Sequence, residues 1–202
     1  LSLNNDARVT LDDGGFLEFV EASVVSQSVN ARAKLVNRGT ILVNAFSPAY
    51  AFLMDLDVVN ERGGHIHFLA GALRFSSLGQ FNNTGGTLLL NNQTIISTDR
   101  ALIISAGVFE GPGTILGDLR ATSSGEIRPG NGLYLVGNFS MEDSSTRLSV
   151  FFGEQFVSFF DIRGQARFAG RMEVEVDNTI GQRPENETFT VMRYAGRGSS
   201  NF

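Results

Sequence analysis

Two acidic residues have a spacing that suits catalysis or metal binding. Asp55 and Asp57 stand two residues apart, which on a β-strand projects both carboxylates from one face. Such a pair can bind calcium, or can act as acid and base in polysaccharide cleavage. No second acidic pair lies one repeat away in phase. The sequence therefore favours two solvated charges on an outer face.

Two histidines follow with the same spacing. His65 and His67 would share a strand face, where paired imidazoles can hold zinc or copper. The chain contains no other histidine and no cysteine, so a third ligand would have to come from a neighbouring repeat. We therefore expect no metal and no cofactor. We expect both histidines to occupy positions that threonine fills in other repeats.

An acidic stripe alternates with valines near the C-terminal end and follows three arginines. Ion pairing between neighbouring strands is the ordinary explanation for this pattern, and a sugar- or cation-binding stripe is the alternative. The residues are Arg163, Arg167, Arg171, Glu173, Glu175 and Asp177.

Five phenylalanines crowd a short segment just before this stripe. Their density is too high for one buried strand face, so we expect either a hydrophobic cap on one end of the fold or an interface with a partner. The members of this candidate interface are Phe151, Phe152, Phe156, Phe159 and Phe160.

A local phrase that recurs along the chain predicts the scaffold that positions these residues. It runs from an apolar residue through Asn or an acid to a glycine corner, then through Thr or His into an apolar strand. The last glycines of four copies are Gly39, Gly64, Gly86 and Gly113, separated by 25, 22 and 27 residues. A repeat of this length with about three strands per unit indicates a solenoid, whereas a sandwich would turn every 8–12 residues or so.

We therefore predict an all-β, right-handed, single-stranded parallel β-helix of about six to eight coils. Asparagines at matching corners can stack as a hydrogen-bonded ladder, and we expect some of Asn37, Asn60 and Asn82 or Asn83 to do so. A short helix over residues 49–59 is the alternative to strands there, and the alternation of residues 55–58 favours strands.

From about residue 109 onward the chain resembles the passenger regions of bacterial autotransporters and related exported β-helical proteins. Four phrases carry the resemblance in order: residues 111–117, 125–137, 161–170 and 187–194. The resemblance implies a right-handed β-helix on an exported protein. Its corner motif comprises Gly111, Gly113, Gly125, Pro129, Gly130 and Gly132.

Charge and composition limit the classes of partner that this chain can have. A net charge of −5 argues against nucleic acid or an anionic membrane as the main partner. No run of eighteen apolar residues is present, so we expect no membrane-spanning helix. We expect one β-helix domain over residues 1–202, a fragment of a longer exported protein. Its coils should be regular over about 1–138, and more irregular and aromatic over about 139–202.

The expected function is structural and adhesive. We expect a non-enzymatic rod, extracellular or on a bacterial cell surface, that binds other proteins, surface glycans or copies of itself through a broad face. One alternative is a subunit of an extracellular filament or sheath. The other is a polysaccharide lyase or glycoside hydrolase of pectate-lyase-like architecture, with Asp55 and Asp57 as its candidate groups.

Overall fold

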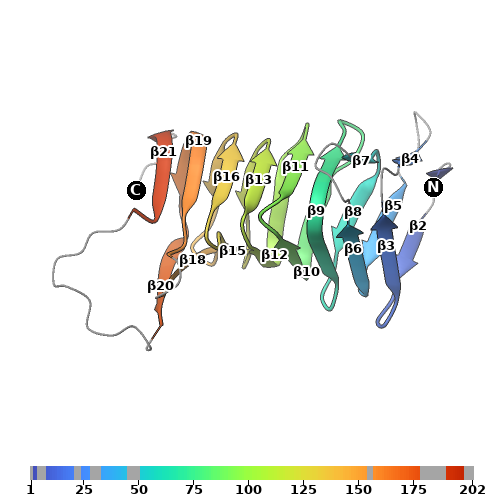
Figure 1. Ribbon diagram of the computed structural model, residues 1–202, viewed down its shortest axis with the longest axis horizontal. Coiled ribbons are helices and arrows are strands. Elements are labelled where there is room, and N and C mark those ends of the chain that lie inside the picture. Colours follow the sequence, from blue (N-terminus) through green and yellow to red (C-terminus); the bar gives the residue numbers. More distant parts are fainter. Residues whose placement is uncertain are drawn as a thin grey trace.

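The protein is a rod of stacked β-coils. The computed structural model describes residues 2–3, 8–20, 24–27, 33–44, 51–153, 157–177 and 190–197. Every regular element within these residues is a β-strand, and the strands stack as a parallel β-solenoid of about six turns (Figure 1). The predicted parallel β-helix is confirmed. Two strands, β7 (Ala51–Met54) and β8 (Asp57–Asn60), occupy the segment where a helix was the alternative.

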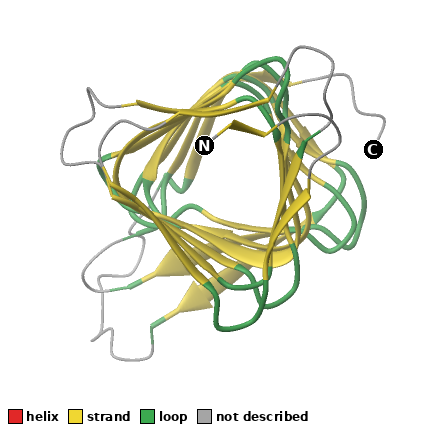
Figure 2. Ribbon diagram, turned by 90° about the vertical axis from the view of Figure 1, so that its right-hand side faces the viewer, coloured by secondary structure: helices red, strands yellow, loops and turns green. Residues whose placement is uncertain are grey.

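Three faces run the length of the rod and enclose its core (Figure 2). Each face is a ladder of parallel strands, and the long strands bend from one face to the next. Face A contains β2 (Arg8–Leu11), β5 (Lys34–Asn37), β8, the starts of β10 (Phe81–Leu90) and β12 (Leu102–Glu110), β14 (Leu119–Ala121), β17 (Phe139–Met141) and the end of β19 (Phe160–Phe168). Face B contains β3 (Phe16–Val20), β6 (Thr40–Asn44), the start of β9 (His65–Phe75), the ends of β10 and β12, β15 (Glu126–Arg128), β18 (Arg147–Phe152) and β20 (Arg171–Val176). Face C contains β1 (Ser2–Leu3), β4 (Val24–Gln27), β7, the end of β9, β11 (Thr94–Thr98), β13 (Gly113–Leu116), β16 (Leu133–Val136), the start of β19, and β21 (Met192–Arg197).

The core consists of apolar side chains stacked in rows, one residue per coil. A row follows from the parallel register, because alternate residues of each strand point inward and meet the same position of the next coil. The clearest row lies on face B, where every member is at most 3% exposed. Its members are Ile41, Ile66, Leu88, Phe109, Ile127 and Leu148.

A column of glycines forms the corner between faces A and B. Thr87 pairs with Val108, which places Gly107 beside Gly86. A β-carbon on Gly107 would stand 2.2 Å from the Gly86 carbonyl oxygen, so this corner admits no side chain. The prediction that Gly113 continues the series was wrong. Gly113 begins β13 on face C, whereas the glycine column continues at Gly107, 21 residues after Gly86.

The predicted corner motif is divided between two corners of the solenoid. Five of its six residues form two stacked corners between faces B and C, in which Gly111 N donates to Arg128 O at 2.9 Å and Gly113 N donates to Gly132 O at 3.0 Å. Gly130 adopts φ +61°, and a β-carbon added there would stand 2.9 Å from the backbone N of Pro112, so both conformation and space favour glycine. Pro129 is buried in the same corner. Gly125 instead continues the glycine column, since Glu126 pairs with Val108.

A buried asparagine ladder crosses three coils, as predicted, with Asn83 as its third member. Asn37 Nδ2 donates to Asn60 Oδ1 at 2.8 Å, and Asn60 Nδ2 donates to Asn83 Oδ1 at 3.0 Å. Asn83 Nδ2 ends the ladder on the carbonyl oxygens of Gly86 and Val108. All three side chains are fully buried, and they replace apolar residues in a face A core row.

The stacking continues without a break past residue 138. Strands β17, β18 and β19 pair in parallel with the coil before them, so these strands extend the same solenoid. Within the described residues no helix is long and apolar enough to cross a membrane.

Candidate functional site

The two aspartates do not form a paired site on one strand. Asp57 begins β8, whereas Asp55 lies in the connection before it, so the prediction that both project from one strand face was wrong. Asp57 Oδ1 accepts a hydrogen bond from the Gln80 backbone N at 3.1 Å. This bond anchors the connection before β10 and gives Asp57 a structural role.

The two histidines lie on the outer side of β9. Their ring centroids are 6.1 Å apart in an edge-to-face arrangement. His65 is in register with Thr40 and Thr87, as expected, whereas His67 aligns with Leu42 and Leu89. Partial burial lowers the pKa of His67, and the positive charge of His65 adds to this effect. No group of three or more histidine or acidic residues is placed to hold a metal ion in the part of the chain that the structure describes.

The acidic stripe pairs differently from the prediction. Glu173 is paired across strands with Arg147 of β18, at 3.7 Å, an arginine that the sequence pattern did not single out. Arg171 pairs with Glu173 within its own strand at 3.4 Å. Arg163 likewise pairs with its strand neighbour Asp161 at 2.8 Å. Cross-strand pairing therefore exists here, but the three predicted arginines do not provide it among the described residues.

The aromatic cluster is divided between the core and the surface. Phe160 is fully buried against Phe139, with ring centroids 5.0 Å apart, so it is a core residue and no part of an accessible interface. Phe151, Phe152 and Phe159 are half-buried. Phe156 lies outside the described residues.

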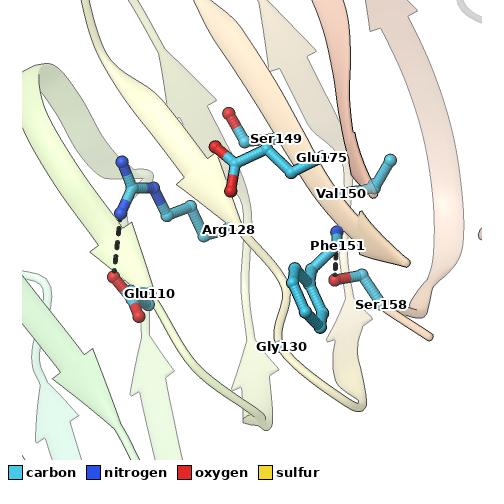
Figure 3. A pocket seen from close by; sticks show the side chains of 8 residues that line it. All are labelled: Glu110, Arg128, Gly130, Ser149, Val150, Phe151, Ser158 and Glu175. Atoms are coloured by element: carbon cyan, nitrogen blue, oxygen red, sulfur yellow. Dashed lines mark hydrogen bonds and ion pairs between the residues drawn. The ribbon is translucent and has the colours of Figure 1, made fainter. Parts of the chain in front are cut away.

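A groove on the outer side of face B brings several polar groups together with one of these rings. Its cavity measures about 250 Å³. It opens across β12, β15, β18 and β20, and Figure 3 shows the side chains that line it. The lining residues are Glu110, Arg128, Gly130, Ser149, Val150, Phe151, Ser158 and Glu175.

One wall of the groove is built by the chain after β18. Val157 pairs antiparallel with Phe152. Ser158 fixes this pairing, because its hydroxyl accepts from Phe151 N at 2.8 Å while its own N donates to Phe151 O at 2.8 Å. The Phe159 N then donates to Gly130 O at 3.2 Å. These bonds hold the Phe151 ring at the rim.

A carboxylate beside the groove anchors its charged residues. Glu126 is only 5% exposed and accepts from Arg128 Nε at 2.8 Å and from the Ser149 hydroxyl at 2.7 Å. Arg147 lies 3.7 Å from its second oxygen, on the neighbouring strand. Burial acts to raise the pKa of Glu126, but the hydrogen bonds from Arg128 and Ser149, with the charge of both arginines, outweigh burial and hold it below its ordinary value.

These contacts join into one chain of alternating charges. Arg128 also reaches Glu110, 3.4 Å from Nη1, and Arg147 also reaches Glu173. The sequence reading missed this site because partners one coil apart are 18 to 26 residues apart, with no fixed spacing. The signal that could have found it is the register along face B: Glu110 pairs with Arg128, Glu126 with Arg147, and Ser149 with Glu173.

The low pKa of Glu126 predicts a pH-dependent contribution to stability. A carboxylate whose pKa is lower in the folded than in the unfolded state stabilises the fold above its ordinary pKa, here 4.5, and loses this contribution as the pH falls through the folded value. Replacing Glu126 by Gln is expected to lower the free energy of unfolding by about 1–3 kcal/mol at pH 7. The deficit should shrink below pH 4.5, as measured by urea unfolding across a pH series.

The matched control is Glu142→Gln, because Glu142 makes an exposed pair with Arg120 at 2.7 Å. Its loss at pH 7 should be within about 1 kcal/mol. A deficit for Glu126→Gln that is equal at pH 7 and pH 3 would contradict the role assigned to its charge.

No protein-family model matches this chain, nor does any curated protein or solved structure. The class of molecule is set by its fold and site: a parallel β-solenoid with a groove of mixed polar and apolar lining on one outer face.

Proposed function

We propose that this protein is an exported, non-enzymatic β-solenoid that acts as a structural and adhesive rod at a bacterial cell surface or outside the cell. The observation that carries the proposal is the register of face B, which holds outward side chains in fixed rows from coil to coil. The side chains of Glu110, Arg128, Ser149 and Glu173 are already positioned by their strands, so no loop has to become ordered when a partner binds. Such preorganisation lowers the entropic cost of binding.

The groove is the best-defined part of this display surface. It combines carboxylates, a guanidinium, hydroxyls and an aromatic ring, which is the mixed polar and apolar lining typical of recognition sites. Glu126 holds Arg128, and Ser158 holds the backbone of Phe151, so both side chains are positioned before a partner arrives. In this proposal the partners are other proteins or surface glycans.

Binding of the fluorescently labelled protein to bacterial and animal cells tests the adhesive role. We expect saturable binding that unlabelled protein competes away. The protein is tested at concentrations up to about 100-fold above a micromolar dissociation constant. Binding that does not saturate, or no binding to any cell type in this range, would refute the adhesive proposal.

Self-assembly is the second candidate, favoured by one end of the rod. Met172, Val174 and Val176 occupy inward positions of β20, since they pair with Leu148, Val150 and Phe152 of β18, yet they are 47%, 59% and 57% exposed. Among the described strands β20 pairs only with β18, and at the opposite end β3 pairs only with β6. Two parallel edges of matching geometry favour head-to-tail stacking of copies, since unpaired strand edges are templates for pairing.

A charge placed at this end is expected to prevent such assembly. Sedimentation of the parent chain should show oligomers that grow with concentration, whereas Val174→Lys should remain monomeric because lysine would be placed in the contact. The control is Val136→Lys on face C, where the parent residue is similarly exposed at 52%, and it should assemble like the parent. A parent that stays monomeric at every concentration would rule out the filament candidate.

A further inference from the structure

We infer that the groove on face B binds one ring of a neutral saccharide. This inference rests on the proposed display function and names the ligand class of its best-defined site. It is carried by three features of the groove: unused hydrogen-bonding capacity, an aromatic ring at the rim, and charges of both signs side by side.

The first feature is the free hydrogen-bonding capacity of Arg128 and Glu175. A guanidinium has five N–H donors, and Arg128 directs Nε to Glu126 and Nη1 to Glu110, which leaves donors on Nη2. Glu175 makes no hydrogen bond with any described residue, and its carboxylate faces Arg128 (Figure 3). Together the two groups offer a donor and an acceptor side by side, which matches adjacent hydroxyls of a sugar, since each hydroxyl both donates and accepts.

The second feature is the ring of Phe151. It is half-buried at the mouth of the groove, and the Ser158 hydroxyl fixes its backbone. A pyranose presents an apolar face of C–H groups as well as its hydroxyls. Aromatic rings pack such faces at little entropic cost because they have only two side-chain torsions.

The third feature is the charge balance, which favours a neutral ligand. Arg128 is flanked by Glu110 and Glu175, and these acidic residues raise the pKa of the guanidinium together with Glu126, whose hydrogen bond is the largest contribution. An anionic sugar would be placed against two carboxylates, and a cationic peptide against the arginine. In each case binding would remove water from a group of the groove and bring a like charge against it. This costs more free energy than binding a neutral polyol. The cavity of about 250 Å³ suits a single ring, so longer chains would extend along the open side.

Titration with defined oligosaccharides tests the inference. The probes are cellohexaose, maltohexaose and mannohexaose as neutral chains, with hexagalacturonate and hexalysine as charged comparisons, followed by calorimetry and saturation-transfer NMR. We expect at least one neutral chain to bind and both charged probes to bind at least tenfold more weakly. Glu175→Ala should weaken neutral binding at least tenfold, while the control Glu142→Ala, in an exposed ion pair outside the groove, should bind like the parent.

Each other outcome overturns the inference. Tighter binding of hexagalacturonate or hexalysine would reject the neutral ligand class, and unchanged binding in Glu175→Ala would reject the groove. Glu175 is exposed on the terminal strand, so the variant should fold, and equal thermal melting of variant and parent verifies this. If no saccharide binds but cell binding persists and is unaffected by Glu175→Ala, the inference fails while the adhesive proposal stands.

Discussion

Gly107→Ala is expected to lower the free energy of unfolding by about 3–5 kcal/mol, one of the two largest single-residue losses that we predict for this rod. Two costs combine. Gly107 adopts φ +76°, a left-handed conformation that disfavours a side chain by about 1–2 kcal/mol. In addition, the new β-carbon would lie 2.2 Å from the Gly86 carbonyl oxygen, so the two coils would have to move apart. Urea unfolding followed by circular dichroism measures the loss.

Gly14→Ala separates these two costs. Gly14 has nearly the same φ, +77°, but no heavy atom lies within 4 Å of a β-carbon built there. Its loss should therefore be only the conformational cost of about 1–2 kcal/mol. Equal losses in the two variants would show that Gly107 is required for its backbone conformation alone, and that close approach of the coils contributes nothing there.

The same glycines explain how far the sequence could predict the fold. Gly39, Gly64 and Gly86 follow the corner phrase closely enough to indicate a solenoid and its asparagine ladder. The next corner glycine, Gly107, follows Gly86 after 21 residues, close to the earlier spacing, but Val108 stands after it in place of Thr or His. The corner phrase itself recurs at Gly113, which has the right residue type at the wrong corner. Local sequence specifies what a corner looks like, whereas its place in the stack depends on the lengths of all the coils before it.

The groove could not be predicted for a related physical reason. Glu126 and Arg128 are neighbours on β15, and nothing in that pair alone marks a site. Their importance arises when the register brings Ser149 and Arg147 of β18 against Glu126, and Glu110 of β12 against Arg128. In a parallel solenoid these partners come from the coils before and after a strand, so spacing within one strand reveals only part of a site.

Asn60→Ala is expected to lower the free energy of unfolding by about 3–5 kcal/mol, because it interrupts the buried ladder at its centre. Asn60 accepts from Asn37 and donates both to Asn83 and to the Thr87 carbonyl oxygen. Replacing it by alanine removes three hydrogen bonds and leaves a void. It also takes one hydrogen-bond partner from each of the buried side-chain amides of Asn37 and Asn83, in a site with no exposure to water. Thermal and urea unfolding of the parent and the variant measure the effect.

Asn37→Ala is the matched control at the end of the same ladder. Asn37 Nδ2 donates to Asn60 and, at 3.3 Å, to the His65 carbonyl oxygen, whereas its Oδ1 has no hydrogen-bond partner among the described residues. Folding removes water from this oxygen and gives it no hydrogen bond in return, so the oxygen destabilises the fold. Asn37→Ala removes that unfavourable group together with the two hydrogen bonds, and the expected loss in the free energy of unfolding is only about 1–2 kcal/mol. If the ladder acts as a connected network, Asn60 must cost more than Asn37. Equal losses would mean that each asparagine contributes through its own backbone contacts, and that the coils are held in register by apolar packing alone.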